Sequence, residues 1–216
     1  MSESNSVGPV DPAAILDPLA LFEAWFREAH QSEVNDPNAA ALATATGSGV
    51  PSVRMVLIKP LPETPGQPRK LEDILCFFTN AESRKGRELA ENPRAALCLH
   101  WKSLRRQIRA EGTITELPAA ISDAYFHSRS RMSQIGAAVS QQSRTLASRA
   151  ELEEKAQAFA AAHSPEAGEI PRPGYWRGFQ LHPTRLEFWL DGPNRLHDRF
   201  LFTLEDGQWQ KSRLYP

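Results

Sequence analysis

The sequence predicts a mainly β fold: an antiparallel β-barrel with helices packed outside it. Short apolar segments typical of strands follow one another from residue 40 to the C-terminus. Turn signals separate several of them, among them Gly47-Ser48-Gly49 and Asp206-Gly207. Segments with helical spacing interrupt the strands at only a few places, so we expect the helices at the periphery of one antiparallel barrel.

The composition is that of an ordinary globular protein. The chain has 216 residues, of which 24% are charged and 41% hydrophobic, and its formal net charge is −1. A nearly neutral chain has no global field that would steer it to nucleic acid or to an anionic membrane. No apolar run approaches the ~20 residues that span a bilayer, and the N-terminus lacks the pattern of a secretory signal. We therefore expect a cytoplasmic protein that binds neither nucleic acid nor membrane.

The two cysteines, Cys76 and Cys98, lie in apolar segments and are expected to be reduced and buried. No Cys/His spacing indicates a metal site. The sequence also lacks a dinucleotide-binding glycine motif, a P-loop, a nucleophile elbow and an RNA-binding signature. The common cofactor and nucleic-acid motifs therefore give no lead to the function.

The beginning of the chain divides into two parts. Residues 1–16 carry little pattern and are predicted to form a flexible N-terminal arm, whereas residues 17–216 are predicted to form a single domain. Asp17 followed by Pro18 predicts the start of a helix, because aspartate caps helix N-termini and proline is favoured at the first helical position.

Further helices are expected from Ser83 to just before Pro93 and, in pieces, over residues 118–163, where Ser148 opens a capping box. Residues 60–73 are rich in proline and are expected to form a loop. Strands are expected at 40–46, 52–59, 74–79, 95–101, 106–116, 176–183, 184–190, 199–205 and 208–214.

Two cations, Arg84 and Lys85, occupy the first turn of the helix predicted to begin at Ser83. The helix dipole already places positive charge there, so each cation costs a few tenths of a kcal/mol, roughly, unless an anion is bound. Backbone N–H groups and both side chains could converge on a phosphate. A solvated basic turn explains this segment as well, and for the segment alone it is the simpler interpretation.

A second basic pair, Arg54 and Lys59, lies on the strand predicted at 52–59. A separation of five residues places the two side chains on opposite faces of a regular strand. One cation could therefore meet an anion while the other meets a second ligand or solvent. A strand with charged ends is an equally good interpretation.

Two further patterns suggest anion recognition. Tyr125, Arg129 and Ser133 are four residues apart and would share one face of a continuous helix, where they could clamp a phosphate. An ordinary polar helix face has the same pattern. Near the C-terminus, alternating cationic residues would share one face of a strand and could line a site for anionic ligands, although a solvated strand edge remains an alternative. These residues are Arg195, His197 and Arg199.

Taken together, these segments resemble the pyridoxamine 5′-phosphate oxidase family, also called pyridoxine 5′-phosphate oxidases. The resemblance runs from about Asp17 to Pro216 and rests on motifs in a fixed order. They are RMVLIK at 54–59, FFTN and SRKG within 77–86, LRRQIRAEG at 104–112, YFHSRSRMSQIGAAVSQQS at 125–143, EFW at 187–189, RLHDR at 195–199 and RLYP at the end. The resemblance implies an FMN-binding split β-barrel with peripheral helices that works as a homodimer, with FMN between the subunits.

The resemblance also implies a role for each site residue. Arg54, Arg84 and Lys85 would hold FMN, mainly its phosphate, within a cofactor segment of Arg54, Met55, Val56, Leu57, Ile58 and Lys59. Phe78, Thr79, Gln107, Trp189 and Arg199 would line the rest of the flavin, and Gln142 and Ser143 would reach the flavin of the partner subunit. Lys59, Tyr125, Arg129 and Ser133 would grip the substrate phosphate. Arg195, Leu196 and His197 would lie against the pyridine ring, with Arg195 and His197 as the catalytic pair.

The implied activity is FMN-dependent oxidation of pyridoxamine 5′-phosphate or pyridoxine 5′-phosphate to pyridoxal 5′-phosphate. Oxygen would be the acceptor and would give hydrogen peroxide, with ammonia released from the amine. The chain departs from the family pattern at Phe78, Ala138, Arg177 and Leu190 and in the long 60–73 segment. Two alternatives are a related FMN split-barrel oxidase acting on another substrate, such as a phenazine precursor, and a non-catalytic flavin- or vitamer-binding protein.

Overall fold

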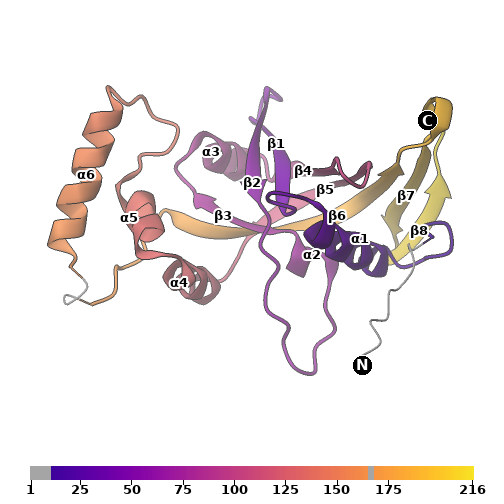
Figure 1. Cartoon of the computed structure of the whole chain (residues 1–216), viewed down its shortest axis with the longest axis horizontal. Helices are drawn as coiled ribbons and strands as arrows, with labels where there is room; N and C mark the ends of the chain where they lie inside the picture. The colour runs from indigo at the N-terminus through magenta and orange to yellow at the C-terminus, as the bar shows by residue number, and fades with distance from the viewer. Residues whose placement is uncertain (1–10, 165–167) are drawn as a thin grey trace.

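One antiparallel sheet runs through the structure, a computed structural model that describes residues 11–164 and 168–216 (Figure 1). The strand order is β2-β1-β4-β5-β6-β7-β8, and β3 pairs with β6 beside this path. Within the described residues the end strands β2 and β8 do not pair, so the predicted antiparallel fold is confirmed but the sheet is open. The strands are β1 (Ala39–Ala45), β2 (Pro51–Leu57), β3 (Cys76–Asn80), β4 (Arg94–Trp101), β5 (Arg106–Glu116), β6 (Trp176–Leu190), β7 (Asp198–Glu205) and β8 (Gln208–Arg213).

Both predicted hairpins form. β1 and β2 pair antiparallel, with Ala45 opposite Pro51. β7 and β8 are joined by Asp206 and Gly207, whose φ angles of 49° and 79° are both left-handed. A two-residue turn with this geometry matches the twist of the flanking strands, which explains the Asp-Gly pair.

The prediction of two separate strands at 176–183 and 184–190 is wrong, because β6 is continuous over 15 residues. The register against β5 shifts where Glu111 pairs with Arg185 and Gly112 pairs with Pro183, so one extra residue bulges from β6. Proline lacks an N–H for the ladder and is accommodated at such a bulge. Gly112 permits the close approach, since a Cβ there would lie 2.0 Å from the carbonyl oxygen of His182.

The helices begin where the capping signals predict. The side chain of Asp17 accepts a hydrogen bond from the backbone N–H of Leu19, and Ser83 and Ser148 cap their helices in the same way. None of the helices in the described part of the chain is long and apolar enough to cross a membrane. The helices are α1 (Pro18–Ser32), α2 (Leu71–Ile74), α3 (Arg84–Glu91), α4 (Ala119–Ser128), α5 (Arg131–Val139) and α6 (Arg149–Ala162), with a short 3-10 turn, η2 (Pro193–Arg195).

The core has two parts. In the larger part α1 packs on the sheet, and the ring of Trp25 meets that of Phe188 edge-on at 5.4 Å. In the smaller part Phe126 and Ile135, from α4 and α5, pack around Trp176 at the start of β6. The larger part therefore runs along β6 from Phe179 to Phe188, whereas the smaller part packs at the first residue of the strand.

Part of the predicted N-terminal arm contacts the sheet. The ammonium of Lys211 on β8 donates hydrogen bonds to the carbonyls of Pro12, Ala13 and Ile15 at 2.6, 2.8 and 2.7 Å. Residues 1–10, which make up most of that predicted arm, lie outside the described residues.

Candidate functional site

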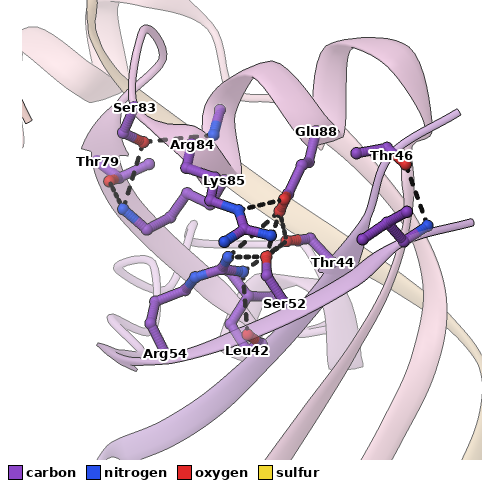
Figure 2. Close-up of polar contacts among 12 residues, drawn as sticks. Leu42, Thr44, Thr46, Ser52, Arg54, Thr79, Ser83, Arg84, Lys85 and Glu88 are labelled. Atoms are coloured by element: carbon purple, nitrogen blue, oxygen red, sulfur yellow. Dashed lines mark hydrogen bonds and ion pairs between the residues drawn. The ribbon is translucent and has the colours of Figure 1, made fainter. Parts of the chain in front are cut away.

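The first cluster of charged side chains lies where the N-terminus of α3 meets β2 (Figure 2). Arg54 on β2 donates to Oγ1 of Thr44 at 2.5 Å and to Oε2 of Glu88 at 3.2 Å. Arg84 in the first turn of α3 donates to the other oxygen, Oε1 of Glu88, at 2.8 Å. We call Arg54, Arg84, Lys85 and Glu88 the α3 cluster.

The carboxylate of Glu88 orients both arginines. Burial alone would raise the pKa of Glu88, but hydrogen bonds from Ser52, Thr44, Arg84 and Arg54 outweigh it and hold the pKa at about 2. Glu88 is therefore charged at neutral pH. It fixes the two guanidinium groups at the helix N-terminus, although sequence reasoning had not singled it out.

Lys85 is the buried cation of the cluster, with 8% of its surface exposed. Its ammonium donates to Oε1 of Gln142 at 2.7 Å, Oγ1 of Thr79 at 3.1 Å and Oγ of Ser83 at 3.3 Å. No carboxylate of the described residues lies within ion-pair distance of it. Burial and then the positive charge of Arg54 lower the pKa of Lys85 to about 8.

The α3 cluster fits a phosphate ester. Arg54, Arg84 and Lys85 supply three positive charges, whereas Glu88 supplies one negative charge. The N-terminus of α3 adds partial positive charge in the same place. A phosphate dianion bound here would balance the surplus and would remove the cost of burying Lys85 without a counter-charge. The residues present therefore fit the phosphate end of FMN.

A pocket of about 360 Å³ lies beside the α3 cluster and is lined by two hydrogen-bond partners of Lys85. Thr79 and Gln142, which hold Lys85, also line this pocket. Arg129 lines it from the connection between α4 and α5, and Ser133 lines it from the first turn of α5. The full lining is Phe78, Thr79, Asn80, Arg129, Ser133, Gly136, Ala137, Ser140, Gln142 and Trp176.

Aromatic rings form one wall of this pocket. Phe78 stacks on Tyr125 with ring centroids 4.1 Å apart and on Trp176 at 5.4 Å. The guanidinium of Arg129 lies 5.1 Å above the ring of Trp176. Nη1 of Arg129 is buried and has no hydrogen-bond partner within the described chain. A charged donor of this kind is available to an anionic ligand.

The prediction that Tyr125, Arg129 and Ser133 share the face of one continuous helix is wrong. α4 ends at Ser128, Arg129 is extended, and the side chain of Ser130 caps α5 by accepting from the backbone N–H of Ser133. A serine that bonds the backbone locally favours such a break. The pocket nevertheless brings Arg129 and Ser133 together, while Tyr125 reaches it through its stack on Phe78.

The segment 54–59 is only partly a strand. β2 ends at Leu57, so the argument that a regular strand separates Arg54 from Lys59 does not hold at its C-terminal end. The backbone N–H of Lys59 donates instead to the carbonyl of Cys76 next to β3. Within the segment, Ile58 is buried, Arg54, Val56 and Lys59 are half-buried, and Met55 and Leu57 are exposed.

A second cluster of predicted site residues lies at the other end of β6. Trp189 is paired with Gln107 on β5 and with Arg199 on β7. Arg199 donates to Oε1 of Glu187 at 2.7 Å, and Arg109 donates to the other oxygen of Glu187 at 2.7 Å. Burial would raise the pKa of Glu187, but the arginines lower it overall.

The prediction that Arg195, His197 and Arg199 share one strand face is wrong. Arg195 belongs to the turn η2, where its φ is 63°, and β7 begins only at Asp198. Arg195 and Leu196 are exposed at this turn. The ring of His197 lies 4.7 Å from that of Trp189. We call Gln107, Trp189, Arg195, His197 and Arg199 the β6-end cluster.

The pocket and the β6-end cluster lie toward opposite ends of β6. Trp176 lines the pocket at the start of β6, and Trp189 lies thirteen residues further along the same strand. At ~3.3 Å per residue, a straight strand would place these two residues at most about 40 Å apart. Gln142 lies with the α3 cluster, and Ser143 follows it in the exposed connection to α6, with a φ of 71°.

Four residues at these sites were missed by sequence reasoning: Glu88, Trp176, Glu187 and Asp191, whose Oδ1 lies 3.0 Å from Nδ1 of His197. Glu88 had a signal, because it follows Arg84 by four residues in a predicted helix. Glu187 and Asp191 act through contacts with other strands and turns, which spacing along the chain does not reveal.

The comparisons with known proteins agree with this geometry. Residues 26–162 match the family described as pyridoxamine 5′-phosphate oxidase, and residues 176–216 match the pyridoxine 5′-phosphate oxidase C-terminal dimerisation region. A pyridoxine/pyridoxamine 5′-phosphate oxidase of Erythrobacter litoralis is 52% identical over 205 residues, which cover 93% of this chain and 91% of that protein. The protein of the same name from Gluconobacter oxydans is 52% identical over 200 residues, which cover 93% of this chain and 94% of that protein.

Solved structures share the fold. PhzG from Burkholderia lata 383, in complex with tetrahydrophenazine-1-carboxylic acid, aligns with a TM-score of 0.84 at 30% identity and covers 98% of this chain and 100% of that one. A pyridoxamine 5′-phosphate oxidase-related, FMN-binding protein from Nostoc punctiforme aligns with a TM-score of 0.71 at 18% identity, covering 94% and 100%. On the extent and identity of these matches, the chain belongs to the pyridoxamine 5′-phosphate oxidase family.

Proposed function

We propose that the chain is an FMN-dependent oxidase that converts pyridoxamine 5′-phosphate or pyridoxine 5′-phosphate to pyridoxal 5′-phosphate. Its membership of an oxidase family, with relatives about half identical over most of the chain, makes it an oxidoreductase. We place it in the cytoplasm, where the free thiols of Cys76 and Cys98 remain reduced.

One observation carries the proposal: two cationic subsites lie side by side and share residues. Lys85 donates to Thr79 and Gln142, and the same two residues line the pocket that contains Arg129. The cofactor and the substrate of this reaction each carry one phosphate. Adjacent subsites would therefore bring the two molecules together in a fixed relative position, which is the main contribution that a protein makes to cofactor chemistry.

The overall reaction balances with oxygen as the acceptor. Pyridoxine 5′-phosphate and O2 give pyridoxal 5′-phosphate and H2O2, whereas pyridoxamine 5′-phosphate, water and O2 give the same aldehyde, H2O2 and ammonia. When bound, FMN supplies the redox chemistry by taking two electrons from the substrate and passing them to O2.

The residues of the chain bind and orient the reactants. Arg54, Arg84 and Lys85 hold the FMN phosphate, and the remaining predicted cofactor residues, including Gln142 and Ser143, surround the flavin. Arg129 and Ser133 bind the substrate phosphate together with Tyr125 and Lys59. The ring of Trp176 supports Arg129 from below, as the distance of 5.1 Å between them indicates.

The active unit is proposed to be a homodimer. The predicted ring-contacting residues Arg195, Leu196 and His197 follow the C-terminal end of β6, whereas the pocket that contains Arg129 and Ser133 lies at the start of β6. A two-fold dimer would place the β6-end cluster of one subunit on the α3 cluster of the other and would complete two equivalent sites. The match of residues 176–216 to a dimerisation region supports this arrangement.

A second candidate function is oxidation of a different substrate by the same type of site. The similarity to PhzG supports it, because that protein was solved with tetrahydrophenazine-1-carboxylic acid, which carries a carboxylate and no phosphate. Arg129 alone would accept either anion, because a guanidinium pairs with carboxylates and with phosphates. The feature that favours a phosphorylated ligand is the complete set of predicted phosphate contacts, which are Lys59, Tyr125, Arg129 and Ser133, together with Arg195 and His197. A non-catalytic flavin-binding protein is the third possibility.

The test uses the purified yellow protein under anaerobic conditions. We expect pyridoxine 5′-phosphate or pyridoxamine 5′-phosphate to bleach the flavin absorbance, and O2 to restore it with release of one H2O2 per aldehyde formed. Unphosphorylated pyridoxine at the same concentration is the matched control and is expected to bleach the protein far more slowly. A protein that stays yellow with both phosphates would overturn the proposal, and bleaching only by a dihydrophenazine or tetrahydrophenazine acid would establish the second candidate.

A further inference from the structure

Three of the predicted flavin residues form one row across the sheet. Trp189 on β6 pairs with Gln107 on β5 and with Arg199 on β7. Glu187 lies two residues before Trp189, so both side chains point to the same face of the sheet. The next row on that face contains Glu187 and its β5 partner Arg109, directly beside the predicted flavin row.

The carboxylate of Glu187 holds one arginine with each oxygen. Oε1 accepts a hydrogen bond from Nε of Arg199 at 2.7 Å, and Oε2 accepts one from Nη2 of Arg109 at 2.7 Å. The Glu187 side chain is 3% exposed, whereas that of Arg199 is 25% exposed. A buried carboxylate with a charged donor on each oxygen has little freedom to turn, so Glu187 fixes the direction in which the side chain of Arg199 leaves β7.

The C-terminal segment holds Arg199 from a second direction. The backbone N–H of Leu214 donates to the carbonyl of Arg199 at 2.9 Å, which extends the contact between β7 and this segment beyond Arg213. The carbonyl of Tyr215 is thereby brought to Nη1 of Arg199, which donates to it at 2.7 Å. Arg213 anchors the segment, because its guanidinium forms an ion pair with Asp198 at 3.4 Å.

These contacts leave one nitrogen of Arg199 for a ligand. Nε is bonded to Glu187 and Nη1 to the carbonyl of Tyr215, whereas Nη2 donates no hydrogen bond within the residues that the structure describes. A guanidinium presents its donors in one rigid plane, so holding two of its nitrogens also sets the direction of the third. Arg109 and Arg199 carry two positive charges against one negative charge on Glu187, so Nη2 remains an effective donor to an electron-rich group.

We propose that Glu187 and the backbone of residues 214–215 clamp Arg199 so that its Nη2 donates to the flavin ring. Glu187 is then a positioning residue, because it acts through Arg199 and needs no contact of its own with FMN. The RLYP motif at the end of the sequence supplies the other side of the clamp. This inference rests on the proposed function, in which Arg199 lines the flavin.

The test measures the dissociation constant of FMN by fluorescence titration of the flavin-stripped protein. Glu187→Gln removes the charge of the carboxylate and is made both in the wild type and in Arg199→Met, where the clamp has no guanidinium to hold. Glu205→Gln, at an exposed position of the neighbouring strand β7, is the matched control. Urea unfolding of each flavin-free variant reports separately how much the change affects the stability of the fold.

A second pair of variants reaches Arg199 from the other side without changing a buried charge. A chain that ends at Arg213 lacks the carbonyl of Tyr215, whereas a chain that ends at Tyr215 keeps an acceptor there as its terminal carboxylate. Leu214 is half-buried and Tyr215 is exposed, so their removal leaves the core intact. This pair decides the question if Glu187→Gln does not fold.

We expect Arg199→Met to weaken FMN binding by about tenfold or more, and Glu187→Gln and the chain that ends at Arg213 each to weaken it by about threefold to tenfold. In the Arg199→Met background each of these two changes should add less than about twofold, because its effect passes through the missing guanidinium. Glu205→Gln and the chain that ends at Tyr215 should bind FMN as the wild type does.

A loss of FMN affinity that is equally large with and without Arg199 would overturn the inference, because it would show a structural effect that does not pass through the guanidinium. Unchanged affinity in Arg199→Met, in a folded Glu187→Gln or in the chain that ends at Arg213 would overturn it as well. If no vitamer phosphate reduces the FMN-loaded wild type, the proposed function fails, while the FMN titrations still decide whether Arg199 is clamped.

Discussion

The ammonium of Lys85 lies 2.7 Å from Oε1 of Gln142, so a buried cation is held by a neutral amide where a carboxylate would be expected. Ion pairing would have stabilised the free protein better, because a buried charge without a counter-charge is costly. The arrangement is favourable once a phosphate binds, since its negative charge then compensates Lys85 directly. The unfavourable free energy of burying Lys85 is therefore offset when the phosphate binds.

Replacement of Lys85 by methionine is expected to weaken FMN binding by about tenfold to a hundredfold, because a charge-assisted hydrogen bond of about 1.5–3 kcal/mol is lost. Flavin fluorescence titration of the stripped protein measures the change. The matched control is Arg87→Met, which removes an exposed cation from the same helix. Equal losses of affinity in the two variants would indicate a general effect of charge and not a phosphate contact of Lys85.

FMN affinity is expected to decrease with pH above about 8. In the free protein, burial and then Arg54 lower the pKa of Lys85 to about 8. A phosphate dianion favours the protonated ammonium, so above that pH binding must be accompanied by proton uptake. The dissociation constant should then rise by up to about tenfold per pH unit. Titrations between about pH 7 and 9.5 test this, and a slope that persists unchanged in Lys85→Met would assign the titration to another group.

Glu88→Gln is expected to lower the free energy of unfolding of the flavin-free protein by about 2–4 kcal/mol, because Arg54 and Arg84 lose their shared carboxylate. Hydrogen bonds in the folded state hold the pKa of Glu88 at about 2, below its ordinary value of 4.5. The stabilisation is therefore fully present above about pH 4.5 and is lost as the pH falls toward 2.

Urea unfolding of both proteins at several pH values measures this difference. The difference in the free energy of unfolding between the wild type and Glu88→Gln should become smaller below about pH 4.5. Glu154→Gln, at an exposed position of α6, should have the same free energy of unfolding as the wild type at every pH. A gap that stays constant with pH would show that the lost packing of the side chain, and not its charge, causes the destabilisation.

Local signals in the sequence predicted the elements well, because caps and turns act over a few residues. Ser83 caps α3, Asp17 caps α1, and Asp206-Gly207 forms the last hairpin, all as the residue types indicate. The strand break predicted after Pro183 is wrong. Proline ends most strands, but here it lies at a bulge in the continuous strand β6. The bulge depends on Gly112 of the neighbouring strand, which no local pattern can supply.

The sequence predicted only those site residues that lie in the motifs shared with the oxidase family. The motifs identified Lys85, Arg129 and Ser133, but the geometric argument for a shared helix face failed because Ser130 starts a new helix. The positions of Arg195 and His197 likewise depend on two left-handed residues in η2, which strand periodicity cannot detect. The Asp191–His197 contact and the support of Arg129 by Trp176 required the tertiary structure.

Arg129→Gln is expected to raise KM for pyridoxine 5′-phosphate by about tenfold or more, because a charge-assisted contact to the phosphate is lost. The side chain stays planar and polar, so its packing above Trp176 is largely kept. Steady-state peroxide release measures KM and kcat for the phosphate and for unphosphorylated pyridoxine. An equal loss for both compounds would mean that Arg129 supports the pocket and does not bind phosphate.

Complementation tests whether each site is built from two chains. Lys85→Met disables the α3 cluster and Arg199→Ala disables the β6-end cluster, so each variant alone should lose most of its activity. In a two-fold dimer a mixed pair contains one site with both changes and one site with neither. When the two variants are unfolded and refolded together, half of the dimers should be mixed, and about a quarter of the wild-type activity should return. A mixture of Lys85→Met with Arg129→Gln, both in the same half of the site, is the matched control and should recover no more than its components. Recovery in neither mixture would mean that a single chain supplies the whole site.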